Sequence, residues 1–247
     1  MIKEAIKHLT ELGTKPEDRL LSVDEDPRLF TFDNEGKVST INPFVVKAYN
    51  CLELRTLPSV LDYIKSGSDL VGESYFLQIE SPTRVSLLSE LLLDGERERL
   101  AKVEPYLPRF DFNSFYDSEE MNIALQSKFI QNHDREVLLQ ILGNVVEENV
   151  KVVGDDGISQ SVITRKGITG KEEVLVPNPV TLAPYRTFIE VVQPESKFIF
   201  RMKEGPRAAI FEADGGAWRN EAINNIKDYL VTNLKEEIES GLITILA

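Results

Sequence analysis

Four basic side chains that lie close together in the sequence form its clearest candidate for a binding site. They are Lys197, Arg201, Lys203 and Arg207. Residues two apart in a β-strand project from the same face, so the first three would share one face of a strand. Such a face can contact the phosphates of a nucleic acid or the surface of a protein. The plainer interpretation is a solvated sheet face whose charges pair with Glu190 and Glu195 across the strands.

Two carboxylates form a second candidate. Glu212 and Asp214 close an apolar run directly before Gly215, Gly216 and a predicted helix. The free N–H groups at the beginning of a helix can bind a ligand there. Because two carboxylates repel an anion, the alternatives for this pair are a helix cap or a cation site.

Other arrangements that support catalysis are missing from the sequence. The glycines of residues 167–172 lack the earlier glycine and the following hydroxyl of a phosphate-binding P-loop. There is also no nucleophile elbow, zinc-protease motif or glycine-rich dinucleotide loop. His8 and His133 are the only histidines, and Cys51 is the only cysteine. We therefore expect no catalytic residue, no metal site and no cofactor, with His133 a solvated residue in the first turn of a helix.

The charge of the chain limits its partners. With 41 acidic and 28 basic residues, the net charge of −13 repels nucleic acids and anionic membranes over most of the surface. Residues 151–207 differ, because nine basic and seven acidic side chains give them a charge of +2. We expect no measurable nucleic-acid binding near physiological salt, and a protein partner, for which a basic surface is one option. The oligomeric state stays open.

Nothing in the sequence signals secretion or membrane insertion. Residues 1–13 are amphipathic and charged, unlike a signal peptide. No stretch reaches the roughly 20 apolar residues of a membrane-spanning helix. A single cysteine excludes an internal disulfide and fits a reducing compartment. We therefore expect a cytoplasmic protein.

Hydrophobic spacing and capping residues predict five helices, over about 2–12, 57–65, 118–129, 132–145 and 217–240. Thr56 and Asp117 are the expected N-caps of the second and third helices. Alternating runs predict strands over 29–32, 37–41, 52–55, 75–80, 84–92, 97–104, 150–153, 158–163, 173–176 and 242–246. The aromatic, proline-containing segment 105–116 predicts a crossover between two halves of the protein.

Residues 185–218 carry the clearest pattern in the chain. Turn residues at 194–196, 203–206 and 214–216 divide them into three apolar runs, which predicts three consecutive antiparallel strands. One face of the middle strand is wholly apolar. It consists of Phe198, Phe200 and Met202. We expect this face to be buried against the C-terminal helix, because that helix has the longest apolar stripe.

Together these patterns predict an α+β fold of mostly antiparallel sheets, with a central helical hairpin and a long C-terminal helix. The 247 residues, 42% of them hydrophobic, provide enough material for a large core. We expect a single domain over residues 1–247, with a sub-division near 105–117 as the alternative.

Three segments occur in an order that is informative about origin. The sequence LRTLPSVLDYI at 54–64 is followed by Lys128-Phe129-Ile130, and then by Val-Pro-Asn-Pro at 176–179 before a predicted strand pair. In this order they resemble a family of uncharacterised phage and prophage proteins that includes YfdQ. The resemblance implies a protein made inside an infected or lysogenic bacterium, and it implies no established activity.

We therefore expect a non-enzymatic phage-type protein that acts by binding another macromolecule, most simply a protein. Two alternatives stay open: an enzyme that acts on a small or phosphorylated ligand, and a structural component of the virion. A deep pocket with perturbed titratable groups would favour the enzyme. Presence in purified particles would favour the virion component.

The first testable prediction concerns metal. Because the sequence offers only two histidines and one cysteine as ligands of this kind, thermal unfolding should have the same midpoint with and without a strong chelator. Differential scanning fluorimetry measures this. A shift of several degrees would contradict the prediction and would return attention to Glu212 and Asp214.

Overall fold

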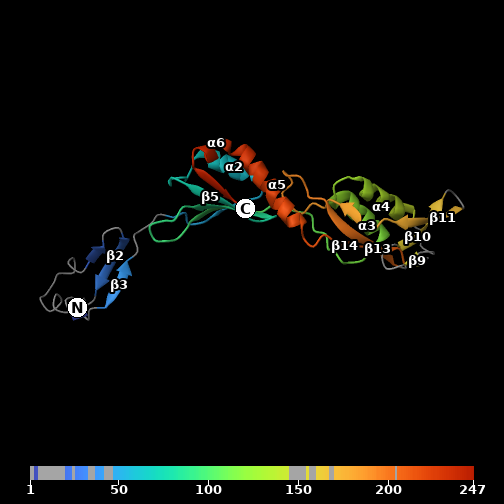
Figure 1. The fold of residues 1–247 in the computed structure, drawn as a ribbon, viewed down its shortest axis with the longest axis horizontal. Helices are drawn as coiled ribbons and strands as arrows, with labels where there is room; N and C mark the ends of the chain where they lie inside the picture. The colour runs from blue at the N-terminus through green and yellow to red at the C-terminus, as the bar shows by residue number, and fades with distance from the viewer. Residues whose placement is uncertain are drawn as a thin grey trace.

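The computed structural model describes residues 3–4, 20–23, 26–32, 37–41, 47–144, 154–155, 160–166, 170–203 and 205–247. Helices and mostly antiparallel sheets make up these residues, so the predicted α+β class is confirmed. The groups of elements lie along the long axis of an elongated molecule, with the C-terminal α5 and α6 beside α2 and β5 in its middle (Figure 1). No helix in the described ranges is long and apolar enough to cross a membrane.

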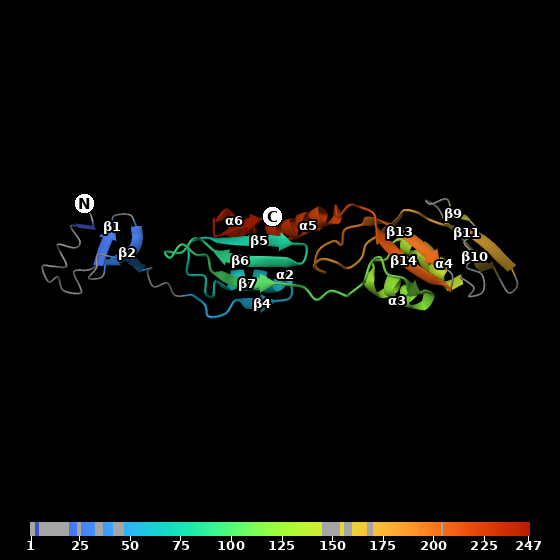
Figure 2. The ribbon, with the colours of Figure 1, turned by 90° about the horizontal axis from the view of Figure 1, so that it is seen from below.

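A five-stranded sheet forms the middle of the molecule. In spatial order its strands are β15 (Ile243–Leu246), β5 (Tyr75–Ser81), β6 (Arg84–Ser89), β7 (Arg99–Val103) and β4 (Leu52–Leu54). The three central strands are antiparallel, whereas each edge strand runs parallel to its neighbour. Figure 2 shows β5, β6, β7 and β4 side by side. The predicted strand over 242–246 is therefore confirmed as an edge strand.

Three helices lie along one side of this sheet (Figure 1). They are α2 (Leu57–Ser66), α5 (Trp218–Asn233) and α6 (Lys235–Glu239). The hydroxyl of Thr56 accepts a hydrogen bond from the Ser59 N–H at 3.3 Å and so caps α2, as predicted. Gly67 ends the helix with φ of 64°, a conformation that a residue with a Cβ adopts only at a cost.

A four-stranded antiparallel sheet forms the second large group. Its order is β12 (Val180–Leu182), β13 (Ser196–Lys203), β14 (Arg207–Glu212) and β8 (Tyr116–Asp117). Two helices, α3 (Ser118–Lys128) and α4 (His133–Asn144), pack on one face and form the predicted helical hairpin. The predicted capping box is also present, because Asp117 accepts from the Glu120 N–H and Glu120 accepts from the Asp117 N–H.

Two smaller antiparallel sheets complete the described residues. One has the order β1 (Leu20–Val23), β2 (Asp26–Phe32) and β3 (Val38–Ile41). The other has the order β11 (Gly170–Val176), β10 (Gln160–Lys166) and β9 (Gly154–Asp155). Pairing of β2 with β3 confirms the first predicted hairpin. The turn of that hairpin, nearly all of the helix over 2–12, the strand over 150–153 and residues 167–169 lie outside the described residues.

The expected packing of the middle strand against the C-terminal helix is wrong. Phe198, Phe200 and Met202 are buried as predicted, but they pack with α3 and α4, through residues such as Met121 and Leu138. The C-terminal helix instead buries Ile226, Leu230 and Leu234 in a separate core over β5, β6 and β7. The chain leaves this first core after β7 and builds the second core. It contacts the first core again through Phe188 and Val191 and returns to it at α5. The C-terminal helix therefore covers a sheet that is distant in the sequence.

One of the three strands predicted over residues 185–218 is also absent. The run 185–193 forms a loop. In its place β12 pairs with β13, on the side opposite β14. Phe188 and Val191 of this loop enter the first core. The loop keeps its shape because the side chain of Gln193 bonds to its backbone. Its Oε1 accepts from the N–H groups of Arg186 and Thr187, at 3.1 and 3.2 Å, and its Nε2 donates to the Phe188 carbonyl at 2.8 Å.

The predicted C-terminal helix over 217–240 is divided in two. Leu234 has φ of −116° and ψ of 30°, and it separates α5 from α6. Its side chain stays fully buried across the break, while α6 continues against β15. Gly241, with φ of 81°, ends α6 and leads into β15.

We predict that Phe200→Ala lowers the free energy of unfolding by about 3–5 kcal/mol, because the ring is fully buried between β13 and the helices α3 and α4. The adjacent substitution Ile199→Ala is the matched control, since Ile199 projects from the opposite face and is 38% exposed. It should cost less than about 1 kcal/mol. Urea denaturation measures both, and equal losses would contradict the assignment of the two faces.

Candidate functional site

The four basic residues lie where β13 and β14 present the face opposite the helices. Along β13, buried and accessible residues alternate from Ser196 to Lys203. Lys197 and Lys203 are exposed, Arg201 is half-buried, and Arg207 is exposed at the beginning of β14. The open face of these strands is toward the viewer in Figure 2, with α4 behind it. The structure therefore places the predicted cations on an accessible surface.

Strand register places two of the cations side by side. Lys203 lies directly opposite Arg207, and the next pair on the same face is Arg201 with Ala209. Ile199 follows, opposite Phe211. Like charges directly opposite each other in a sheet are destabilising. The pair Lys203 and Arg207 thus has an energetic cost unless another group compensates it.

Phe115 is the residue that both cations contact. The Lys203 amine lies 3.9 Å from the centroid of the Phe115 ring, and Arg207 Nη2 donates to the Phe115 carbonyl at 3.1 Å. The Phe115 and Phe211 rings meet edge to face, 6.1 Å apart. We call the four cations together with Phe115, Ile199 and Phe211 the basic face. Sequence reasoning missed Phe115 because it lies 92 residues before Arg207.

Ion pairs with Glu190 and Glu195 were the plainer interpretation of the basic face. Within the described part of the chain, no ion pair joins Glu190 or Glu195 to Lys197, Lys203 or Arg207. The strand that would have carried Glu190 across from β13 does not form. Asp117 lies opposite Arg207 in the sheet, but its carboxylate accepts the Glu120 N–H at 2.7 Å. That carboxylate is oriented to cap α3.

Many cations elsewhere on the protein are paired. Lys47 contacts both Asp94 and Glu96 at 2.6 Å, and hydrogen bonding from its amine holds the pKa of Asp94 below the usual value. Arg84 bonds to Glu104 at 2.7 Å. In a protein with such an excess of carboxylates, three exposed cations that have no carboxylate partner among the described residues favour a local positive potential. All three lie on one face, where Lys203 and Arg207 are directly opposite each other and Lys197 lies six residues from Lys203 along β13.

The second sequence candidate forms a structural cluster around Arg186. The buried guanidinium of Arg186 donates to Glu212 at 3.1 Å and to the Ser196 hydroxyl, and it lies 4.0 Å above the Trp218 ring. Burial is the main cause that lowers the pKa of Arg186 to about 10, against the opposing effects of Asp214 and Glu212. Arg186 therefore stays charged at neutral pH. The sequence signal for it was an arginine inside an otherwise apolar run.

Asp214 caps the beginning of α5. Its carboxylate accepts hydrogen bonds from the Gly216 N–H at 2.9 Å, the Ser196 hydroxyl at 2.8 Å and the Trp218 N–H at 3.3 Å. Burial alone would raise the pKa of Asp214, but these hydrogen bonds and nearby Arg186 outweigh burial and hold the pKa below its usual value. This geometry favours the helix cap for Asp214, whereas Glu212 pairs with Arg186 instead.

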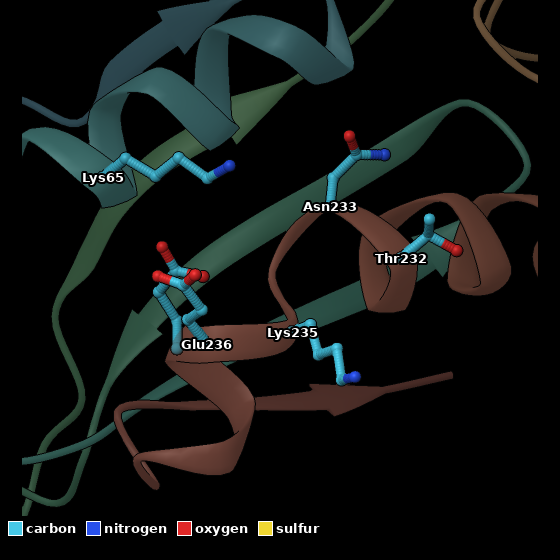
Figure 3. Close-up of a pocket in the computed structure, with 6 residues that line it drawn as sticks. Lys65, Thr232, Asn233, Lys235 and Glu236 are labelled. Atoms are coloured by element: carbon cyan, nitrogen blue, oxygen red, sulfur yellow. The ribbon is translucent and has the colours of Figure 1, made fainter.

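A surface pocket of about 420 Å³ lies between α2 and the junction of α5 with α6. The Lys65 amine reaches into the space between α2 and the end of α5, whereas Lys235 points away from it (Figure 3). Two further groups of the lining are bonded within α5, because Thr232 Oγ1 donates to the Asp228 carbonyl and Asn233 Nδ2 donates to the Tyr229 carbonyl. With Glu236 and Glu237 completing a lining of mixed charge, this pocket selects no ligand class.

The remaining candidates supply no chemistry. His133 is exposed as the first residue of α4. Among the described residues, no group of three or more His, Cys, Asp or Glu side chains is arranged to hold a metal ion. Comparisons with models of protein families, with curated proteins and with solved structures found no match to this chain. The resemblance to phage and prophage proteins stays an expectation from the sequence.

We predict that Asp214→Asn lowers stability at neutral pH and not in acid. A carboxylate whose pKa is lower in the folded than in the unfolded protein stabilises the fold above its unfolded pKa, and this contribution is lost as pH falls through the folded pKa. The difference between native protein and variant should be about 1 kcal/mol at pH 7 and should disappear as pH falls below the lowered pKa of Asp214 in the folded protein. Urea denaturation across this range measures it, with Asp228→Asn, an exposed residue of α5, as the control.

Proposed function

We propose that this protein acts by binding a protein partner through the basic face. The observation that carries the proposal is the group of exposed cations Lys197, Lys203 and Arg207 without carboxylate partners in the described structure, together with Phe115 and Phe211. Charged groups on a surface determine partner choice and association rate when the partner has complementary charge.

The scaffold behind the basic face supports this role. Phe198, Phe200 and Met202 on the opposite side of β13 are buried against two helices. Regular strands with a packed core on one side hold side chains on the other side in fixed positions, which reduces the entropy that binding must remove. A partner would therefore meet a surface that is already arranged.

A protein fits this surface better than a long nucleic acid. Affinity for a nucleic acid depends on the number of phosphates that cations neutralise, and the basic face offers four cations on a chain with a net charge of −13. A protein partner needs complementary charge only over the area of contact. The phage origin implied by the sequence makes a bacterial lysate the natural source of partners.

The test compares proteins captured from lysate of an infected bacterium by the native chain and by the double variant Lys203→Glu, Arg207→Glu. We expect the native chain to capture at least one protein that the variant does not, as measured by quantitative mass spectrometry. The double variant Lys65→Glu, Lys227→Glu is the matched control, because it makes the same change in charge at exposed residues outside the basic face.

The two variants must first have the unfolding midpoint of the native chain, so that a loss of capture is not a loss of structure. Identical captured proteins for the native chain and the variant of the basic face would overturn the proposal. Capture that both double variants lose equally would also overturn it, because the effect would then follow net charge alone.

A further inference from the structure

Cationic and apolar pairs occupy different positions along the basic face. Lys203 and Arg207 form one pair, and Ile199 and Phe211 form another, with Arg201 and Ala209 between them. Successive pairs on one face of a sheet are separated by about 7 Å. Ala209 is fully buried although its partner Arg201 is accessible. Phe115 contacts Phe211 and Lys203, which belong to the cross-strand pairs on either side of Ala209.

Contacts with Phe115 hold the side chains of Lys203 and Arg207 next to each other. The Lys203 amine is fixed over the Phe115 ring, and one Nη2 hydrogen of Arg207 is used by the Phe115 carbonyl. The guanidinium still has other N–H donors, whose planar geometry matches a carboxylate. A carboxylate between the two cations would also remove the repulsion between like charges that face each other across the strands.

We propose that the basic face recognises an acidic and aromatic segment of the partner protein. One carboxylate of the segment lies between Lys203 and Arg207, and an apolar side chain of the segment covers Ile199 and Phe211. This inference rests on the proposed function and adds the chemistry of the partner. It replaces a basic partner, which the net charge alone suggested, because the site of contact is locally positive.

The aromatic residues of the basic face favour a protein segment over a single-stranded nucleic acid. Nucleic-acid platforms stack bases on open aromatic rings. Here the Phe115 ring already has the Lys203 amine over its face and meets Phe211 edge to face. A base therefore finds this ring already occupied, whereas an aliphatic or aromatic side chain can cover Ile199, which is 38% exposed.

The test uses a fluorescent peptide of Glu-Glu-Phe-Phe repeats, which in an extended chain places carboxylates and rings on each side. Two further probes are the same peptide with glutamine in place of every glutamate, and single-stranded oligo-dT. Fluorescence anisotropy measures binding to the native chain, to the double variant Lys203→Gln, Arg207→Gln, and to the control Lys65→Gln, Lys227→Gln. Unfolding midpoints of all three proteins are compared first.

We expect the acidic peptide to bind the native chain and the control equally, and to bind the basic-face variant at least about tenfold more weakly. Binding should weaken as salt rises. The glutamine peptide should also bind at least about tenfold more weakly. Equal binding of the two peptides, or tighter binding of oligo-dT than of the acidic peptide at about 0.15 M salt, would overturn the inference.

The outcomes separate this inference from the proposed function. If capture from lysate depends on Lys203 and Arg207 but the acidic peptide does not bind, the proposed function stands and the inference about partner chemistry fails. If the acidic peptide binds at the basic face but capture is the same for the native chain and its Lys203→Glu, Arg207→Glu variant, recognition of acidic segments stands and the proposed function fails.

Discussion

The side chain of Gln193 holds the segment on which the arrangement of the two hydrophobic cores depends. It is 6% exposed, and its amide bonds to the backbone of residues 186–191 at both of its ends. Buried backbone groups need hydrogen-bond partners, and in a strand a neighbouring strand would supply them. Here one side chain supplies them. The segment can therefore turn Phe188 and Val191 into the first core while β13, which begins only three residues later, belongs to the second.

Further contacts join the same segment to both groups of elements. The Thr187 hydroxyl donates to the Pro82 carbonyl at 2.6 Å, which ties the loop to the turn between β5 and β6. Asn225 of α5 donates to the Val192 carbonyl at 2.9 Å. On the other side, Arg186 bonds to Glu212 and packs on Trp218, where β14 ends and α5 begins. Removing a charge from water is costly, so the buried Arg186 guanidinium needs these partners, and the cluster holds the end of β14 next to the beginning of α5.

The junction and the basic face lie on the same two strands. Glu212, at the end of β14, serves the junction through Arg186, whereas Arg207, at its beginning, belongs to the basic face. The cross-strand pair Phe198 and Glu212 lies on one face of the sheet and the pair Lys203 and Arg207 on the other, because successive side chains point to opposite faces. The same short hairpin thus carries at one end Glu212, which pairs with the buried Arg186, and at the other end the exposed cations Lys203 and Arg207.

The features that the sequence alone determined result from interactions within short segments of the chain. The cap of α2 by Thr56, the capping box of α3 and the opposite faces of β13 depend on residues a few positions apart, and each of them agrees with its prediction. Tertiary structure decided the rest. The run 185–193 has the composition of a strand, but Gln193 satisfies its backbone as a loop; the C-terminal helix has the right stripe, but it covers a different sheet. Phe115 belongs to the basic face although it lies 92 residues before Arg207 in the chain. A hydrophobic pattern indicates that a face is buried, but it does not identify the element that covers this face. Many apolar faces far away in the sequence could bury it equally well.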